Sequence, residues 1–164
     1  MQTKLISAAA LLLAATLSHA ADGKKAAASI PDNTPILMQA EVGSLDKRVE
    51  VAYVCDSQQG KRNVNAMYGI KDGETAVVQI KVGDQVTPGL WRVMNDTNGK
   101  KQNSYYGEGL TWITDKASPD TLTKANGKIL MQAGKLDGGL PKGDQTILFK
   151  DCKVDSAATK KLKK

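Results

Sequence analysis

The only two cysteines in this 164-residue chain, Cys55 and Cys152, stand near the two ends of its strand-like region. Cys55 closes the alternating run Val49–Cys55, and Cys152 follows the apolar run that ends at Phe149. A bond between them would tie the first predicted strand to the last and close a loop that contains almost every apolar run of the sequence. We therefore predict a Cys55–Cys152 disulfide.

The N-terminus predicts an oxidising destination, in which such a bond persists. Lys4 precedes an apolar stretch from Leu5 to Leu17, and Ser18 and Ala20 place small residues where signal peptidase cleaves. Residues 1–20 therefore predict a secretory signal peptide, and the mature chain is expected to be exported and soluble. Cleavage would also remove His19, the only histidine.

A mature chain without imidazole lacks the commonest general base and the usual activator of serine and cysteine nucleophiles. Aspartates in predicted loops, and the incomplete calcium-loop pattern that begins at Met94, are explained better as turn residues. We therefore expect no enzymatic activity, no metal site and no cofactor.

Charge and aromatic content divide the mature chain into three parts. Residues 21–47 contain no aromatic residue and predict a flexible arm, in which Ile36–Met38 is the one segment expected to dock. Residues 48–154 form the predicted folded domain, and residues 155–164 a solvated basic tail. The stretch 48–152 has 14 basic and 12 acidic residues, whereas residues 153–164 have five basic and one acidic, so most of the net charge of the mature chain lies at its C-terminal end. A nearly neutral body argues against a nucleic-acid partner.

Apolar residues in the body alternate with polar ones, which is the period of half-buried strands. Turn signals such as Lys71–Gly73 separate the runs, and Pro88 and Gly89 interrupt one of them. Gly107–Gly109 is interpreted as a strand bend. The predicted strands are 49–55, 64–70, 76–82, 85–94 (interrupted), 105–113, 128–133 and 145–150.

Seven or eight antiparallel strands in about a hundred residues predict an all-β fold, a small barrel or sandwich. Strict alternation puts Cys152 on the face of Leu148 and not on that of Phe149. The last strand must therefore bulge or end before the cysteine. Because adjacent strand residues face opposite sides, at least one of Tyr105 and Tyr106 is expected to be exposed as a contact residue, the other pointing into the core.

Several motifs together resemble the adhesin complex protein family of Gram-negative bacteria, over about residues 49–154. They are Tyr53-Val54-Cys55, Gln59-Gly60-Lys61, Met67-Tyr68-Gly69, Tyr105-Tyr106-Gly107-Glu108-Gly109 and Ile147-Leu148-Phe149-Lys150-Asp151-Cys152. That family is similar to the inhibitors of C-type lysozyme, which are eight-stranded antiparallel barrels with one disulfide. The resemblance implies the same barrel here.

The resemblance also implies a function, a site and a location. The function is inhibition of host C-type lysozyme by a loop that enters the active-site cleft, together with a role as a surface adhesin. Ser104 and Lys116 are the nearest matches to the inhibitors' cleft-facing serine and lysine, although Ser104 lacks the glycine that should follow it. With Tyr105 and Tyr106 they form the expected contact site. The expected location is the periplasm, or the outer membrane with exposure at the cell surface.

An alternative remains, namely a surface adhesin or polyanion-binding protein that does not inhibit lysozyme. Host cell surfaces, anionic glycans and anionic lipids would then be the partners. The residues expected to contact them are the lysines of the tail, Lys160, Lys161, Lys163 and Lys164.

Overall fold

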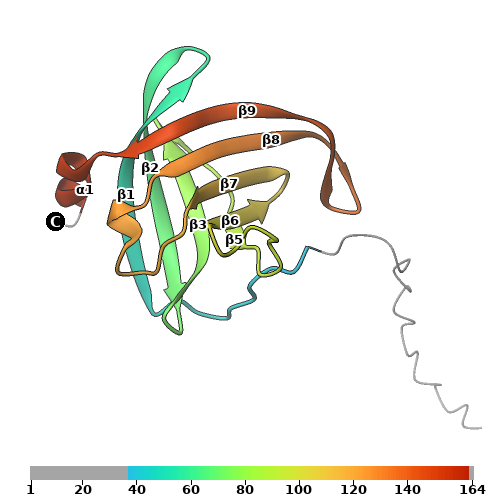
Figure 1. Ribbon diagram of the computed structural model, residues 1–164, viewed down its shortest axis with the longest axis horizontal. Coiled ribbons are helices and arrows are strands. Elements are labelled where there is room, and N and C mark those ends of the chain that lie inside the picture. Colours follow the sequence, from blue (N-terminus) through green and yellow to red (C-terminus); the bar gives the residue numbers. More distant parts are fainter. Residues whose placement is uncertain (1–36, 163–164) are drawn as a thin grey trace, which may run out of the picture. The chain divides into compact units, whose positions relative to one another are not determined.

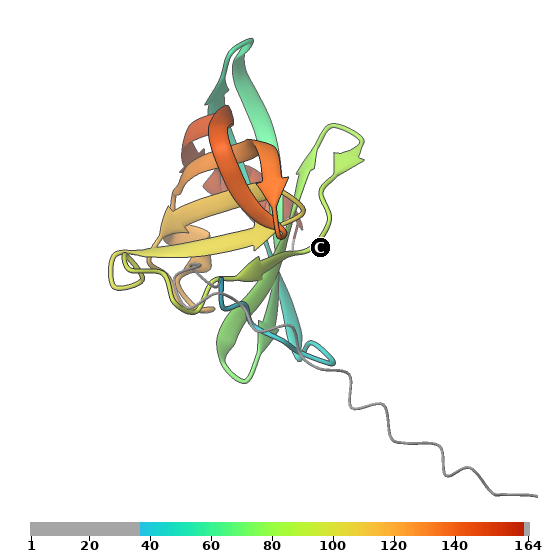
Figure 2. The ribbon, with the colours of Figure 1, turned by 90° about the vertical axis from the view of Figure 1, so that its right-hand side faces the viewer.

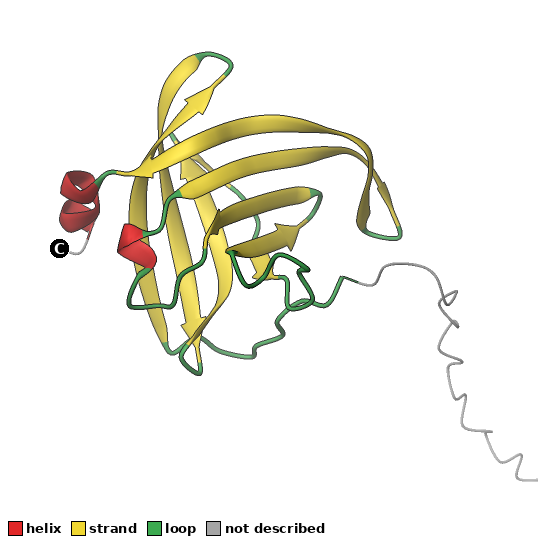
Figure 3. Cartoon of the chain, viewed as in Figure 1, coloured by secondary structure: helices red, strands yellow, loops and turns green. Residues whose placement is uncertain are grey.

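The computed structural model describes residues 37–162. The predicted signal peptide, the first part of the predicted arm, Lys163 and Lys164 lie outside these residues. The described chain folds into strands, one short 3₁₀ helix and one α-helix (Figures 1 and 3). The elements are β1 (Lys47–Ser57), β2 (Gly60–Lys71), β3 (Glu74–Val82), β4 (Gln85–Val86), β5 (Leu90–Arg92), β6 (Gln102–Gly107), β7 (Leu110–Asp115), η1 (Leu122–Lys124), β8 (Gly127–Asp137), β9 (Leu140–Val154) and α1 (Ser156–Leu162).

The strands form one closed antiparallel barrel. The sheet order is β2-β1-β9-β8-β7-β6-β5-β3-β4, and pairing of β2 with β3 closes the ring. Eight strands make the ring, because β4 pairs only with β3 and lies outside it. The predicted eight-stranded barrel is confirmed. No helix among residues 37–162 is long and apolar enough to cross a membrane.

Two of the predicted breaks are confirmed, and one prediction is wrong. Asp72 and Gly73 form a tight turn, both with positive φ, and the interruption at Pro88 separates β4 from β5. The single strand predicted for 105–113 is instead a hairpin. Glu108 (φ 47°) and Gly109 (φ 82°) reverse the chain, so Gly107 pairs with Leu110. Two consecutive residues with positive φ are typical of a two-residue hairpin turn, and the alternation of the flanking strands had concealed it.

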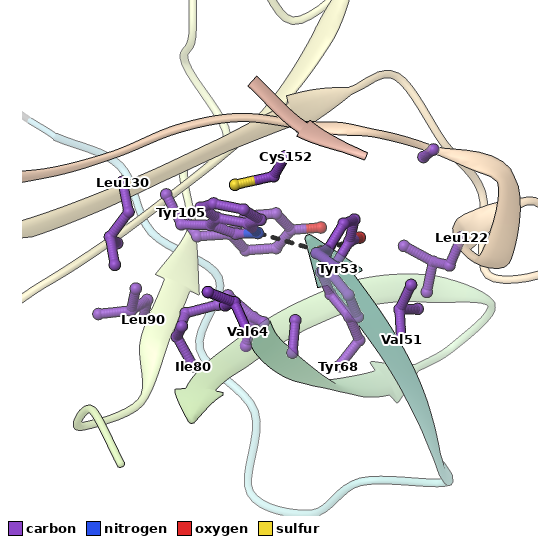
Figure 4. Close-up of a cluster of buried hydrophobic side chains, with 14 of the residues drawn as sticks. Val51, Tyr53, Val64, Tyr68, Ile80, Leu90, Tyr105, Leu122, Leu130 and Cys152 are labelled. Atoms are coloured by element: carbon purple, nitrogen blue, oxygen red, sulfur yellow. Dashed lines mark hydrogen bonds between the residues drawn. The ribbon is translucent and has the colours of Figure 1, made fainter. Parts of the chain in front are cut away.

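Four aromatic side chains fill the centre of the barrel (Figure 4). Trp112, Tyr53, Tyr68 and Tyr105 are all at most 1% exposed. The Tyr68 hydroxyl accepts a hydrogen bond from Trp112 Nε1 at 3.0 Å and lies 3.0 Å from the Tyr53 hydroxyl. Tyr105 donates to Thr75 Oγ1 at 2.8 Å. Burial raises the pKa of all three tyrosines, so they stay uncharged, and the polar groups of these four aromatic side chains are hydrogen-bonded.

The predicted disulfide joins Cys55 to Cys152, with both cysteines completely buried. The predicted bulge is also present. Val54 pairs with Lys153 and Asp56 with Lys150, so Cys55 faces two residues of β9, and Asp151 has a φ of 50°. This extra residue shifts the alternation of β9 by one position, so Cys152 points into the barrel.

Both ends of the described chain lie against the barrel. The predicted solvated tail is wrong for residues 156–162, which form α1. Thr159 of this helix is 2% exposed, and its hydroxyl accepts a hydrogen bond from the Ala52 N–H at 2.9 Å. At the other end, Gln39 bridges to Val93, and Ala40 donates to the Arg92 carbonyl at 2.9 Å. Part of the predicted arm therefore lies along β5.

Candidate functional site

The four predicted contact residues lie on or next to the β6–β7 hairpin, but three of them are buried. Ser104 is 7% exposed, Tyr105 0% and Tyr106 5%. Lys116 follows the last residue of β7 and is exposed. The expectation that one of the two tyrosines is exposed is therefore wrong.

The outward tyrosine is covered by a distant part of the chain. Tyr105 points into the core, and Tyr106 faces the other side of β6, as strand geometry requires. The Tyr106 hydroxyl donates a hydrogen bond to the carbonyl of Gly139, in the turn between β8 and β9. The backbone carbonyl of Tyr106 accepts a hydrogen bond from the Gln39 side chain. Tyr106 thus fastens the β8–β9 hairpin and the arm to β6.

Ser104 acts within a network centred on Asp96. Its hydroxyl donates to Asp96 Oδ2 at 2.5 Å, Gln102 Nε2 donates to the same oxygen at 3.1 Å, and the Asn98 N–H donates to Oδ1 at 2.7 Å. Burial raises the pKa of Asp96, but these hydrogen bonds and the positive charge of Arg92 outweigh it and hold the pKa below its usual value. The carboxylate thus fixes the shape of the turn between β5 and β6.

This turn presents lysines to solvent. Gly99 donates to the Asp96 carbonyl at 2.9 Å, and Lys100 and Lys101 follow, both exposed. The Lys116 N–H donates to the Lys101 carbonyl at 3.3 Å, which brings the end of β7 beside the turn. We call Lys100, Lys101 and Lys116 the lysine cluster. Figure 2 shows the yellow-green segment between β5 and β6 projecting at the side of the barrel.

The lysine cluster has no carboxylate partner within the described chain. The ion pairs there involve other lysines, and the nearby Asp115 pairs with Lys128 at 3.8 Å. Two lysines on an ordered turn and a third on the segment beside it form a cationic surface suited to a carboxylate-bearing partner. Among residues 37–162, no three acidic, histidine or cysteine side chains gather in a way that could hold a metal ion.

The sequence motifs single out Lys116 alone among these three lysines. They give Lys100 and Lys101 no role, and they indicate Asp96 only as a turn residue. A signal was present, because an aspartate two residues before an asparagine and three before a glycine is typical of a side-chain-capped turn. Residues after such a turn are held in a defined position.

A second cationic surface lies on α1. Lys160 and Lys161 are exposed in its last turn, whereas Thr159 next to them is buried. Because that contact orders the helix, these two lysines are displayed from a fixed element rather than from a free tail. Lys163 and Lys164 lie outside the described residues.

Comparison with known proteins identifies a family and a related solved structure. The family described as "ACP-like domain" matches residues 49–154, more than half of the chain. A solved structure titled "Adhesin Complex Protein from Neisseria meningitidis" is 23% identical, and the match covers 65% of this chain and 99% of that chain with a TM-score of 0.48. No protein of curated function matches the sequence.

Proposed function

Since this chain belongs to the ACP-like domain family, the adhesin complex proteins, we propose that it is an exported bacterial inhibitor of host C-type lysozyme. The inhibitor would occlude the active-site cleft with the turn between β5 and β6. It would act in the periplasm or at the outer-membrane surface of a Gram-negative bacterium.

The observation that carries this proposal is the ordered, unpaired lysine cluster. A lysozyme cleft contains catalytic carboxylates, and an ammonium group that enters it forms charge-assisted hydrogen bonds as water leaves. Lys116 keeps its proposed role as a cleft contact, now together with Lys101. Because Asp96 already fixes the turn, little conformational entropy is lost on binding.

Three predicted contact residues take a revised part in the proposal. Ser104 would position the turn through Asp96, and Tyr105 would anchor β6 in the core. Tyr106 would hold the neighbouring β8–β9 hairpin through Gly139. Truncation of either tyrosine would then act on folding as well as on binding.

Inhibition of cell-wall lysis by C-type lysozyme tests the proposal. Lys101→Glu and Lys116→Glu place like charges against the cleft carboxylates, and we expect inhibition at least about thirtyfold weaker, a loss of about 2 kcal/mol. Lys135→Glu, on the exposed end of β8, is the matched control and should inhibit like the parent. The proposal fails if a large excess of parent protein leaves lysis unchanged, or if all three variants inhibit equally.

Attachment to anionic surfaces is a second candidate function, supported by the two exposed lysines of α1. Heparin and vesicles with anionic lipids should retain the parent at low salt and release it as salt rises. Lys160→Gln with Lys161→Gln should weaken retention severalfold and leave lysozyme inhibition unchanged. Equal retention of this variant and the parent would remove α1 from the proposal.

A further inference from the structure

We propose that one end of the barrel binds a free fatty acid, with its acyl chain in an apolar hollow and its carboxylate at Arg62. The hollow lies between the β1–β2 hairpin, the β3–β4 hairpin and β9. We call it the barrel-mouth hollow. It does not include the lysine cluster, so this proposal is independent of lysozyme inhibition.

The hollow exists because β5 covers only part of β3. Val77 and Val78 pair with β5, whereas Lys81 and Val82 pair with the two residues of β4. The chain thus leaves the ring at the end of β3, and the β3–β4 hairpin leans away from β8 and β9 (Figure 2). The barrel is therefore open at this end, with part of its interior facing solvent.

The size and lining of the hollow suit one acyl chain. Its volume is about 910 Å³, within the range of about 300 to 1,000 Å³ found for small-molecule sites. Ile80 and Leu130, which are 1% and 2% exposed, belong to both the core and the lining, and Leu148 and Phe149 add apolar walls. Mouths of β-barrels are a common place for such ligands.

The rim carries apolar side chains that water now contacts. Val86 is 53% exposed and Ile147 is 44% exposed, and both line the hollow. Two exposed apolar side chains that line the same hollow would gain from burial against an alkyl chain.

The charge of the lining selects an anionic head group. Arg62 is the only charged residue that lines the hollow, and no carboxylate lines it. Its guanidinium donates to the Gln59 side-chain oxygen at 2.6 Å and forms no ion pair with any residue from 37 to 162. A planar guanidinium at the rim is suited to a carboxylate, which it can bind through two hydrogen bonds.

Calorimetric titration of the mature protein with laurate, below its micelle concentration, tests the site. We expect saturable binding of one laurate per chain and much weaker binding of dodecyltrimethylammonium, which has the same chain and the opposite charge. Arg62→Gln should weaken laurate binding about tenfold, whereas Arg48→Gln, a matched change away from the hollow, should not.

The apolar half of the site has its own pair of variants. Ile147→Asp puts a charge into the hollow and should weaken laurate binding at least a hundredfold. Leu136→Asp is the control, because Leu136 is 50% exposed and lies outside the hollow. Melting temperatures of all four variants should match the parent, since every altered side chain is on the surface.

Four results would overturn the proposal. The first is absence of saturable laurate binding, and the second is equally tight binding of dodecyltrimethylammonium. The third is that the variants and their controls have equal effects on laurate binding. The fourth is that the protein is a dimer which Ile147→Asp disrupts, while laurate does not bind. The last would identify the hollow as an interface between two copies of this chain. Lys116→Glu should bind laurate like the parent, so failure here is distinct from failure of lysozyme inhibition.

Discussion

At the residue scale, Ser104 is a buried residue that supports the turn between β5 and β6. Its hydroxyl is directed to Asp96, whose carboxylate also accepts from Gln102 and from the backbone of the turn. The network orients Lys100 and Lys101 although neither side chain belongs to it. A single carboxylate therefore links Ser104 of β6 to the turn that carries the exposed lysines.

The first prediction concerns this carboxylate. Asp96→Ala leaves the Ser104 hydroxyl and the Asn98 N–H without their acceptor, so the free energy of unfolding at pH 7 should fall by about 1 to 3 kcal/mol. Lysozyme inhibition should weaken too, because the turn loosens. Urea unfolding provides the measurement, and Asp144→Ala, an exposed aspartate of β9, should unfold like the parent.

The difference in free energy of unfolding between the parent and Asp96→Ala should depend on pH, because the Asp96 carboxylate stabilises the fold only while it is ionised. The pKa of Asp96 is lowered in the folded protein, so its stabilisation is present above the ordinary carboxyl pKa of about 3.9 and is lost as the pH falls through the folded value. The gap between parent and Asp96→Ala should therefore narrow below about pH 4. A gap of the same size at pH 7 and pH 3 would contradict this account.

At the element scale, α1 shows how a short helix is held by one buried contact. A seven-residue helix is marginal in water by itself. Here the Asp155 carboxylate accepts the Ala158 N–H at 2.9 Å at the helix start, and Thr159 accepts the Ala52 N–H of β1. The helix thus depends on the barrel for its order.

Removal of the Thr159 hydroxyl should therefore release α1. Thr159→Val keeps the shape but leaves the buried Ala52 N–H unsatisfied, at a cost of about 1 to 3 kcal/mol. Hydrogen exchange should speed up in residues 156–162 while β2 and β3 stay protected. Ser156→Ala, at an exposed position of the same helix, is the control. Unchanged exchange in α1 would show that another contact holds it.

At the scale of the whole molecule, the Cys55–Cys152 bond reinforces an interrupted seam of the ring. The β1–β9 seam is short and interrupted, with Tyr53, Val54 and Asp56 as its paired residues on β1. The disulfide lies at the interruption, where the bulge at Asp151 breaks the ladder. It joins residues that are 97 positions apart in the sequence.

Loss of this bond should destabilise the barrel strongly. In the chain-entropy account, closing a loop of this length contributes about 4 to 5 kcal/mol to the free energy of unfolding. Thermal unfolding of Cys55→Ala with Cys152→Ala should thus occur far below that of the parent, and reductant should lower the parent to the same level. Two free thiols in native protein, or a parent insensitive to complete reduction, would contradict the prediction.

The sequence alone determined the class of fold and the covalent closure. Alternation records which side of a strand a residue faces, so the all-β class, the breaks at Asp72 and Pro88, and the bulge before Cys152 followed from it. The choice of a barrel over a sandwich came from the resemblance to a known family. The hairpin at Glu108 did not, because the alternation continues across a two-residue turn as it would across a straight strand.

Only the tertiary structure decided what covers each face. Tyr106 faces away from the core, as its place next to Tyr105 on β6 requires, yet the turn at Gly139, far along the chain, buries it. Thr159 is a polar residue in a lysine-rich segment, and it is buried because its hydroxyl accepts a hydrogen bond from the Ala52 N–H of β1. The lysine cluster likewise joins residues of two loops. Local periodicity gives the direction of a side chain, whereas its exposure depends on segments distant in sequence, and these meet only when the barrel closes.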